Sequence, residues 1–343
     1  MDKGKSRIAE LDLLRFIAAL SVVLYHYGHP VDLGSLAQVT EFGFLGVPLF
    51  FMISGFVILW TATKKNAVEF VASRLSRLYP TFWVCVLLTA ATLYATDQRV
   101  TAAQVLANLT MVPDLLRYPK LNDVYWTLLV EIKFYGLVWV LLMARQLLHI
   151  RRWLAGWLGL SILAAVFPHY LHLVALDQYS VYFIAGCYLY LIRTQKPSAR
   201  LILPLAVCAA LSVYNAVGIQ TTFTHDESLR AQGWVSMIVV GEYLAFLGVA
   251  LRQWSLPPAA VWGWLGAMTY PLYLVHSGVV HDLGLHYLRP SPGRVAIMTV
   301  AALFLAWVLA VSIERKGCAA FNRWMLRRVR GPRRRRCLSA VKA

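Results

Sequence analysis

Arg15 and His26 stand eleven residues apart within an apolar stretch that the sequence predicts to be one helix. Eleven residues at about 100° each make three turns plus about 20°, so both side chains share one helix face, roughly 16 Å apart along its axis. A guanidinium binds phosphate, and an imidazole, whose ordinary pKa is about 6.5, exchanges protons near neutral pH. This face therefore suits a long, phosphate-bearing ligand with its reactive end near His26. The alternative is an arginine that reaches the membrane surface and a core histidine bonded to a carbonyl.

A second polar group centres on Glu131, which lies four residues before Tyr135 and shares a helix face with it. A carboxylate here can hold the imidazole of His26 in one tautomer or pair with an arginine. The structural alternative is an ion pair with Arg74 or Arg77. Those two arginines share a helix face as well, where they suit the phosphates of a ligand or the anchoring of a helix at the membrane surface.

Two further segments carry weaker signals. Residues 270–276 predict a helix interrupted by Pro271, in which His276 either faces a site inside the protein or belongs to a packing surface. Residues 43–56 are rich in small side chains, which favour close helix packing. Ser54 in that segment has no neighbouring base that would make it a nucleophile, so we expect it to pack.

The helices that must position these residues are predicted to cross a membrane. Hydrophobic residues make up 59% of the 343-residue chain and charged residues 14%, against about 25% charged in a soluble protein. The apolar residues also form runs near the roughly 20 residues that span a bilayer. We therefore expect an all-α integral membrane protein with about ten transmembrane helices. Their predicted ranges are 8–28, 44–62, 80–96, 124–144, 153–171, 178–192, 201–218, 233–250, 261–282 and 295–313.

The charge pattern predicts the orientation. The net charge is +17, but the lysines and arginines lie between apolar runs and in the C-terminal tail, which argues against a nucleic-acid partner. With the N-terminus inside, 25 of them fall in inside segments and six in outside segments. Because cytoplasmic loops of membrane proteins are rich in these residues, we expect both termini in the cytoplasm and a multi-pass protein of the plasma (inner) membrane.

The chain predicts one membrane domain, residues 1–318, and a basic cytoplasmic tail, residues 319–343. We expect the arginine-rich stretch 323–336 to be attracted to anionic membrane lipids. Residues 11–27 lack a cleavage site, which favours a retained first helix. The five cysteines have no metal-ligand spacing, so the sequence predicts neither a metal site nor a disulfide framework.

Six motifs occur in one order over about 270 residues, and together they resemble the membrane acyltransferase-3 family. They are Leu11-Asp12-Leu-Leu-Arg15-Phe, Arg15-x10-His26, Gly46-Val-Pro-Leu-Phe-Phe-Met-Ile-Ser54-Gly55-Phe, Arg74-Leu-Ser-Arg77-Leu-Tyr-Pro80, Tyr125-Trp126-Thr-Leu-Leu-Val-Glu131 and Tyr270-Pro-Leu-Tyr273-Leu-Val-His276. Thr127 departs from the serine that is commoner at its position in the family.

The resemblance implies a ten-helix membrane enzyme that O-acylates sugars, polysaccharides or small molecules. It implies acetyl-CoA or another acyl-CoA as co-substrate, with no permanently bound cofactor. We expect His26, Glu131 and Arg15 in the chemistry, and Arg15, Arg74 and Arg77 on the donor phosphates. Acceptor-binding candidates are Trp126, Tyr135, Tyr273 and His276.

The sequence therefore predicts a membrane O-acyltransferase that moves an acyl group, which we expect to be acetyl, from cytoplasmic acyl-CoA to a hydroxyl of a sugar or polysaccharide precursor. A carbohydrate or lipid-linked glycan is the expected acceptor, with a polysaccharide-synthesis protein as an additional partner. The main alternative is a transporter or flippase for a lipid-linked sugar, although no internal repeat of the kind common in transporters is evident. Another alternative is a subunit that only holds a synthesis complex together.

Overall fold

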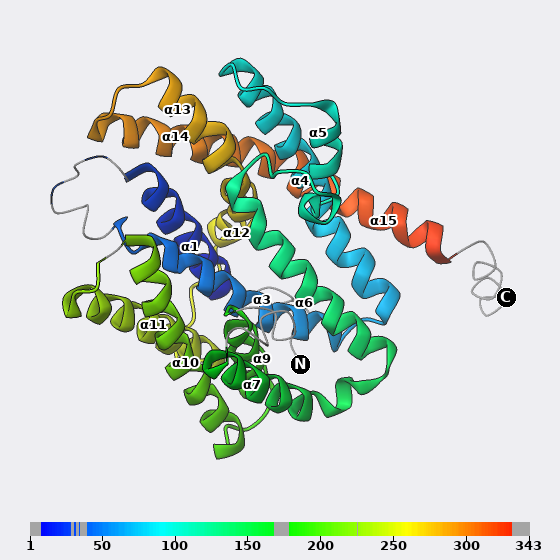
Figure 1. Ribbon diagram of the computed structural model, residues 1–343. Coiled ribbons are helices and arrows are strands. Elements are labelled where there is room, and N and C mark those ends of the chain that lie inside the picture. Colours follow the sequence, from blue (N-terminus) through cyan, green and yellow to red (C-terminus); the bar gives the residue numbers. More distant parts are fainter. Residues whose placement is uncertain are drawn as a thin grey trace, which may run out of the picture.

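The computed structural model describes residues 8–28, 31, 34, 40–167, 178–224 and 226–330, and those residues form helices and loops without a strand (Figure 1). The long α-helices are α1 (Ala9–Gly28), α3 (Gly46–Ala62), α4 (Ala67–Ala95), α6 (Trp126–Met143), α7 (Ile150–Val166), α9 (Ser180–Thr194), α10 (Ala199–Thr224), α11 (Leu229–Ala250), α12 (Ala260–Val275) and α14 (Pro292–Leu309). The shorter ones are η2 (Gly43–Leu45), α5 (Ala102–Asn108), η3 (Pro113–Leu116), η4 (Asp123–Tyr125), η5 (Gln146–His149), η6 (His276–His281), α13 (Asp282–Tyr287), η7 (Ala310–Glu314) and α15 (Gly317–Arg330).

Every one of the ten predicted apolar segments overlaps one of the long helices, although residues 168–171 of the fifth lie outside the described residues. The largest difference is at α4, which begins at Ala67, 13 residues before the predicted start at residue 80. Within the described part of the chain, six helices are long and apolar enough to cross a membrane. They are Gly43–Ala62, Ala67–Ala95, Asp123–Met143, Ala199–Thr222, Leu229–Ala250 and Pro292–Arg328. The protein is therefore an all-helical, multi-pass membrane protein. The total of ten crossings and the cytoplasmic position of both termini stay predictions.

Local sequence signals explain where several helices begin. The side chains of Asn66, Thr101, Ser228 and Ser291 each accept a hydrogen bond from the backbone N–H three residues later, at the start of α4, α5, α11 and α14. Such caps satisfy backbone donors that have no partner inside the helix. The helix starts therefore follow from short polar residues placed before apolar runs.

Helix α9 is the centre of one half of the molecule. It has only 15 residues, but its side chains from Ser180 to Ile192 are all buried among neighbouring helices. It packs closely on α3, where Gly55 lies against the backbone of Phe183 and Gly186 against that of Met52, leaving no room for a methyl group at either glycine. Small residues thus permit the close helix contact that residues 43–56 predict.

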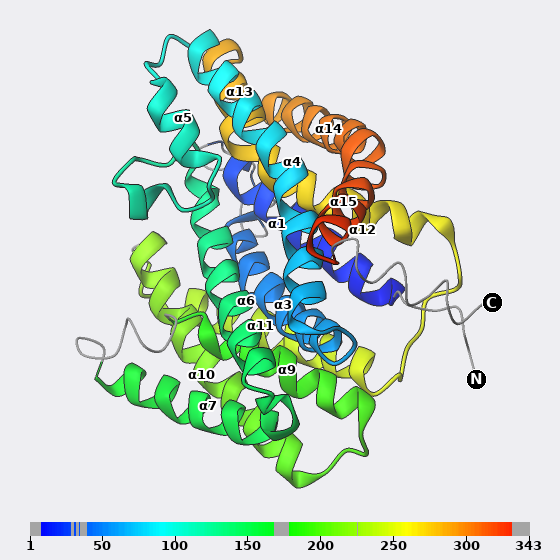
Figure 2. The same cartoon turned by 90° about the vertical axis from the view of Figure 1, so that its right-hand side faces the viewer.

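Helix α1 lies inside the bundle, in contact with α3, α12 and α14 (Figure 2). Helices α7, α9, α10 and α11 gather at one end of the molecule, and α5, α13 and α14 at the other (Figure 1). Since α1 contacts both halves, its side chains are placed to line spaces between them.

Two π-helical turns interrupt the C-terminal helices. η6 follows α12, which contains Pro271, and η7 follows α14. π-turns are rare and frequently occur at functional sites. Here they carry His276 and Glu314, both of which bear on the candidate site.

The remaining sequence predictions concern cysteines and the tail. Cys85, Cys187, Cys208 and Cys318 are free thiols, Cys337 lies outside the described residues, and no metal-binding cluster occurs within the described residues. Residues 317–330 form α15, which packs on α4, whereas the arginines at 333–336 lie outside the described residues. The domain boundary at residue 318 stays a prediction.

Candidate active site

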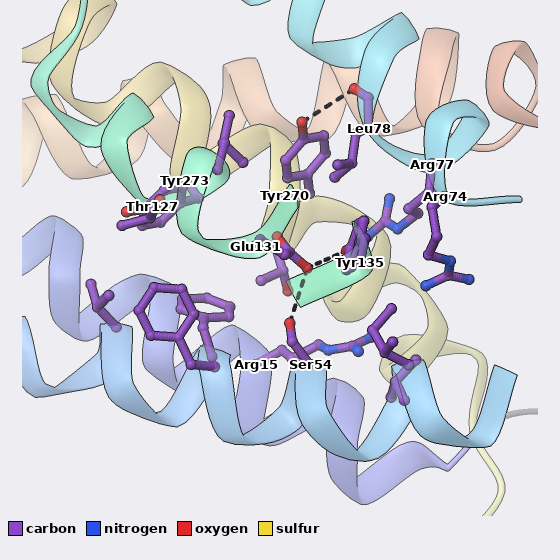
Figure 3. A pocket seen from close by; sticks show the side chains of 17 residues that line it. Arg15, Ser54, Arg74, Arg77, Leu78, Thr127, Glu131, Tyr135, Tyr270 and Tyr273 are labelled. Carbon is purple, nitrogen blue, oxygen red and sulfur yellow. Dashed lines mark hydrogen bonds between the residues drawn. The ribbon is translucent and has the colours of Figure 1, made fainter. Parts of the chain in front are cut away.

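Arg15 and His26 lie on one unbroken helix, as their spacing predicts, and that helix borders two cavities. The first, here named the arginine cavity, is lined by residues that include Arg15, Ser54, Arg74, Arg77, Glu131 and Tyr135 (Figure 3). The second, the histidine cavity, is lined by residues that include His26, Asp123, Trp126, Tyr179 and His281. Val47 and Tyr273 line both, so the two cavities meet at these side chains.

The cavities measure about 200 Å³ and about 400 Å³, respectively. Either one exceeds many times the roughly 10–15 Å³ that one water molecule needs on this measure of volume, so each has room for part of a substrate.

Glu131 is the hydrogen-bonding centre of the arginine cavity. Its Oε1 accepts a hydrogen bond from Ser54 Oγ at 3.0 Å and another from the hydroxyl of Tyr135 (Figure 3). The Tyr135 ring in turn lies 6.0 Å from the guanidinium carbon of Arg74. Ser54, expected only to pack, is therefore part of the polar network, and no single segment of sequence could show this because α3 and α6 bring the two residues together.

Arg77 is held by a carboxylate that the sequence predictions did not include. It forms an ion pair with Glu314 on η7, and Thr81 donates a hydrogen bond to the same carboxylate at 2.8 Å. The guanidinium carbon of Arg77 also lies 5.4 Å from the Tyr270 ring centre. The sequence contains a feature that could have identified Glu314, because it is the only acidic residue after Asp282 in a strongly basic C-terminal region.

The other two arginines keep unused hydrogen-bond donors. Among the described residues, Arg15 has no hydrogen bond or ion pair. Arg74 donates a hydrogen bond to Ser73 Oγ at 3.2 Å and also interacts with Tyr135, while its Nε is buried without a partner. Within the same residues, no ion pair within 4 Å joins Glu131 to Arg74 or Arg77, and the carboxylate is hydrogen-bonded to Ser54 and Tyr135 instead. Unused guanidinium donors facing a cavity suit a phosphate-bearing ligand.

The hydrogen bonding of His26 assigns its tautomer. Its Nδ1 lies 2.8 Å from the carbonyl oxygen of Val22. Because a carbonyl can only accept, Nδ1 carries the hydrogen and the Nε2 of a neutral ring keeps its lone pair. The side chain is half-buried at the edge of the histidine cavity. His26 therefore has the form of a proton acceptor.

His276 lies behind His26, with the two ring centres 5.0 Å apart. Its Nδ1 lies 2.8 Å from the carbonyl of Tyr273, and its Nε2 is buried without a partner among the described residues. Tyr27 donates a hydrogen bond to the backbone carbonyl of His276 at 2.9 Å. His276 is fully buried and lines neither of these two cavities, so its contact with this part of the site is through the His26 ring.

The other acceptor-binding candidates separate between the cavities. Trp126 lines the histidine cavity, where its ring centre lies 5.1 Å from that of Tyr179. Tyr135 lines the arginine cavity. Tyr273 borders both, with its hydroxyl 3.0 Å from Thr127 Oγ1.

The expected contact between Glu131 and His26 is not formed. Glu131 lies about 7.5 Å further along α6 than Trp126, which places it beside the arginine cavity. The polar residues that share the histidine cavity with His26 are instead Asp123 and His281. His281 stacks on Tyr27, with ring centres 6.0 Å apart. The sequence predictions missed both of these lining residues, because Asp123 begins the short turn η4 and His281 ends the π-turn η6, where the 3.6-residue period of an α-helix does not hold.

A family model described as an acyltransferase domain matches residues 8–311. The exopolysaccharide production protein ExoZ of Rhizobium meliloti is 27% identical over 285 residues, which cover 76% of this chain and 84% of ExoZ. BcsY of Komagataeibacter xylinus is 23% identical, covering 93% of this chain and 85% of that protein. The O-acetyltransferase OatA of Staphylococcus aureus is 22% identical, covering 91% of this chain but 58% of OatA. No solved structure matches the chain.

Proposed function

Because the chain belongs to the acyltransferase-3 family of membrane acyltransferases, we propose that it moves an acetyl group from cytoplasmic acetyl-CoA to a hydroxyl of a sugar or polysaccharide precursor. The observation that carries this proposal is the pair of cavities that meet along α1, one rich in arginine and one containing His26. The names of ExoZ and OatA support a polysaccharide acceptor and an acetyl group.

The arginine cavity takes the donor. The phosphates of acyl-CoA bind near its entrance, where Arg15 and Arg74 have unused donors and Arg77 adds a third cation. The uncharged pantetheine arm then runs past Val47 and Tyr273 toward the histidine cavity. Such an arm suits the roughly 16 Å that separate Arg15 from His26 along the helix.

His26 acts as the general base. Its Nε2 takes the proton of the acceptor hydroxyl while that oxygen attacks the thioester carbonyl carbon. The carbon–sulfur bond breaks, the new ester forms, and the thiolate leaves with the proton that His26 returns. His276, in ring contact behind it, holds the base in place.

Glu131 acts on the donor side. Its carboxylate positions Ser54 and Tyr135 and opposes the charge of the three arginines before the phosphates arrive. Trp126 and Tyr179 offer aromatic faces for the acceptor in the histidine cavity, with Asp123 and His281 as hydrogen-bonding groups. Acyl-CoA serves as a co-substrate, and a polysaccharide-synthesis protein that presents the acceptor is a fitting partner.

The test is transfer of label from acetyl-CoA in membranes that contain matched amounts of wild type, His26→Ala or His286→Ala. His286 is an exposed histidine on α13 outside both cavities, and its variant is the control. We expect labelled glycan from wild type and His286→Ala only. Equal labelling by His26→Ala would remove His26 from the chemistry. Movement of a lipid-linked sugar by the purified protein without any acetyl transfer would favour a flippase.

A further inference from the structure

Two further hollows lie beside the arginine cavity. The first, here named the mouth, is lined by Arg15, Trp60, Arg77 and Arg315 among others, and it shares both Arg15 and Arg77 with the arginine cavity. Ile8 and Trp60 of the mouth also line the adjoining hollow, here named the groove. The three spaces therefore form a continuous path around the start of α1.

Two arginines converge in the groove from different helices. Arg193, in the last turn of α9, donates a hydrogen bond to the carbonyl of Val249. The backbone N–H of Arg252 lies 3.1 Å from the same carbonyl oxygen, just beyond the end of α11. One oxygen thus holds both residues together, and both line the groove.

The cations of the groove exceed its acidic partners. Glu10 lines it too, but one of its carboxylate oxygens accepts the backbone N–H of Leu256 at 2.8 Å. Arg252 is exposed and has no hydrogen bond or ion pair from its side chain to any described residue. At the junction with the mouth, Lys64 lies 4.5 Å from the Trp60 ring centre and adds a further cation.

The mouth is also cationic. Arg315 lies 4.0 Å from the Trp264 ring centre, next to the Arg77 ion pair with Glu314. Anionic groups at two places along this path, one at the mouth and one in the groove, would each meet at least two arginines. A ligand that carries phosphates at two separate positions matches that arrangement.

We propose that the groove binds the 3′-phosphate of the acyl-CoA nucleotide through Arg193 and Arg252. The pyrophosphate then lies at the mouth, and the pantetheine arm enters the arginine cavity. This inference rests on the proposed function, because it takes acyl-CoA as the donor. It makes the groove the part of the enzyme that distinguishes coenzyme A from 3′-dephospho-CoA and from donors that lack the nucleotide.

The test compares the binding of CoA and 3′-dephospho-CoA to the purified full-length protein by calorimetry. The variant is Arg252→Gly. Arg252 has a φ of +59°, which glycine adopts without strain, so the substitution removes the guanidinium and keeps the backbone turn. The control is Arg145→Gly, at another exposed arginine with a φ of +57° after the end of α6, outside the described cavities.

Wild type and Arg145→Gly should bind CoA about tenfold more tightly than 3′-dephospho-CoA, as one lost charge-assisted contact would give. Arg252→Gly should lower that preference to about twofold or less, with the affinity for 3′-dephospho-CoA unchanged. No preference in wild type, or an undiminished preference in Arg252→Gly, would overturn the assignment. If Arg252→Gly instead lowers the affinity for CoA and for 3′-dephospho-CoA equally, and does so only in vesicles that contain anionic lipid, the groove would be assigned to a lipid headgroup.

The readout separates this inference from the proposed function. A preference for CoA that depends on Arg252, in a protein that transfers no acetyl group, would support the 3′-phosphate site in the groove and refute the proposed reaction. Acetyl transfer that uses acetyl-CoA and its 3′-dephospho form equally would support the reaction and refute the 3′-phosphate site.

Discussion

The arginine cavity and the histidine cavity lie along the same helix, yet their side chains differ in chemistry. The arginine cavity combines three guanidinium groups with one carboxylate that is already hydrogen-bonded to Ser54 and Tyr135. The histidine cavity contains imidazoles, aromatic rings and Asp123. Fixed charge binds phosphates, whereas proton transfer needs a group that titrates near neutral pH. This difference is the reason for proposing donor binding in one cavity and proton transfer in the other.

Substitution of His26 tests most directly whether the two cavities have separate roles. We expect His26→Ala to lower acetyl transfer by about 10²- to 10⁴-fold, the usual contribution of a general base. CoA affinity should stay within about twofold, because the arginines proposed to bind the phosphates line the other cavity. The measurements are labelled transfer and calorimetry on the same preparations. A parallel loss of CoA binding would show that the cavities do not act separately.

Glu131 tests whether the carboxylate acts on the donor side. Glu131→Gln should lower transfer by about 10- to 100-fold, because an amide removes the one carboxylate that lines the arginine cavity beside the three arginines. The pH dependence of transfer should keep its midpoint, since Glu131 does not contact His26. A midpoint displaced by about one pH unit would instead mean that Glu131 acts on the imidazole.

Substitutions at the ion pair of Arg77 with Glu314 distinguish a contribution to donor binding from a contribution to stability. Arg77→Gln should destabilise the protein by about 1–3 kcal/mol, because the Glu314 side chain is only 6% exposed and loses its partner. The double variant with Glu314→Gln should recover most of that loss in thermal unfolding. It should still show a KM for acetyl-CoA raised by about tenfold. Recovery of the KM together with stability would assign Arg77 a purely structural role.

Trp126 should give the smallest effect. Trp126→Phe keeps an aromatic face in the histidine cavity, so we expect a two- to fivefold rise in the KM for the acceptor, as a partial loss of aromatic contact would give. The KM for acetyl-CoA should not change. A change confined to the KM for acetyl-CoA would mean that the pantetheine arm, and not the acceptor, lies against this ring.

The positions of the long helices, and of residues within one helix, could largely be predicted from periodicity and charge. The spacing of Arg15 and His26 placed them on one face of one helix, and the apolar runs located all ten long helices. Both results depend on geometry within a single helix, which repeats every 3.6 residues whatever lies around it. The same reasoning placed Glu131 and Tyr135 together, and the structure confirms their hydrogen bond.

Contacts between helices were not predictable in this way. Glu131 was expected beside His26 and lies instead against Ser54, which is 77 residues away in sequence. Arg77 was considered as a partner of Glu131 and pairs with Glu314. Each outcome depends on the depth at which two helices cross, and hydrophobic periodicity says nothing about that depth.

The sequence by itself determined that this is a multi-pass helical membrane protein of the acyltransferase-3 family, with Arg15 and His26 on one face of its first long helix. Only the tertiary structure decided that this face borders two cavities, that Glu131 belongs to the first, and that Arg193 and Arg252 meet at one carbonyl oxygen. The physical reason is that a helix fixes the direction of its own side chains, whereas the groups that they meet are fixed by the packing of other helices.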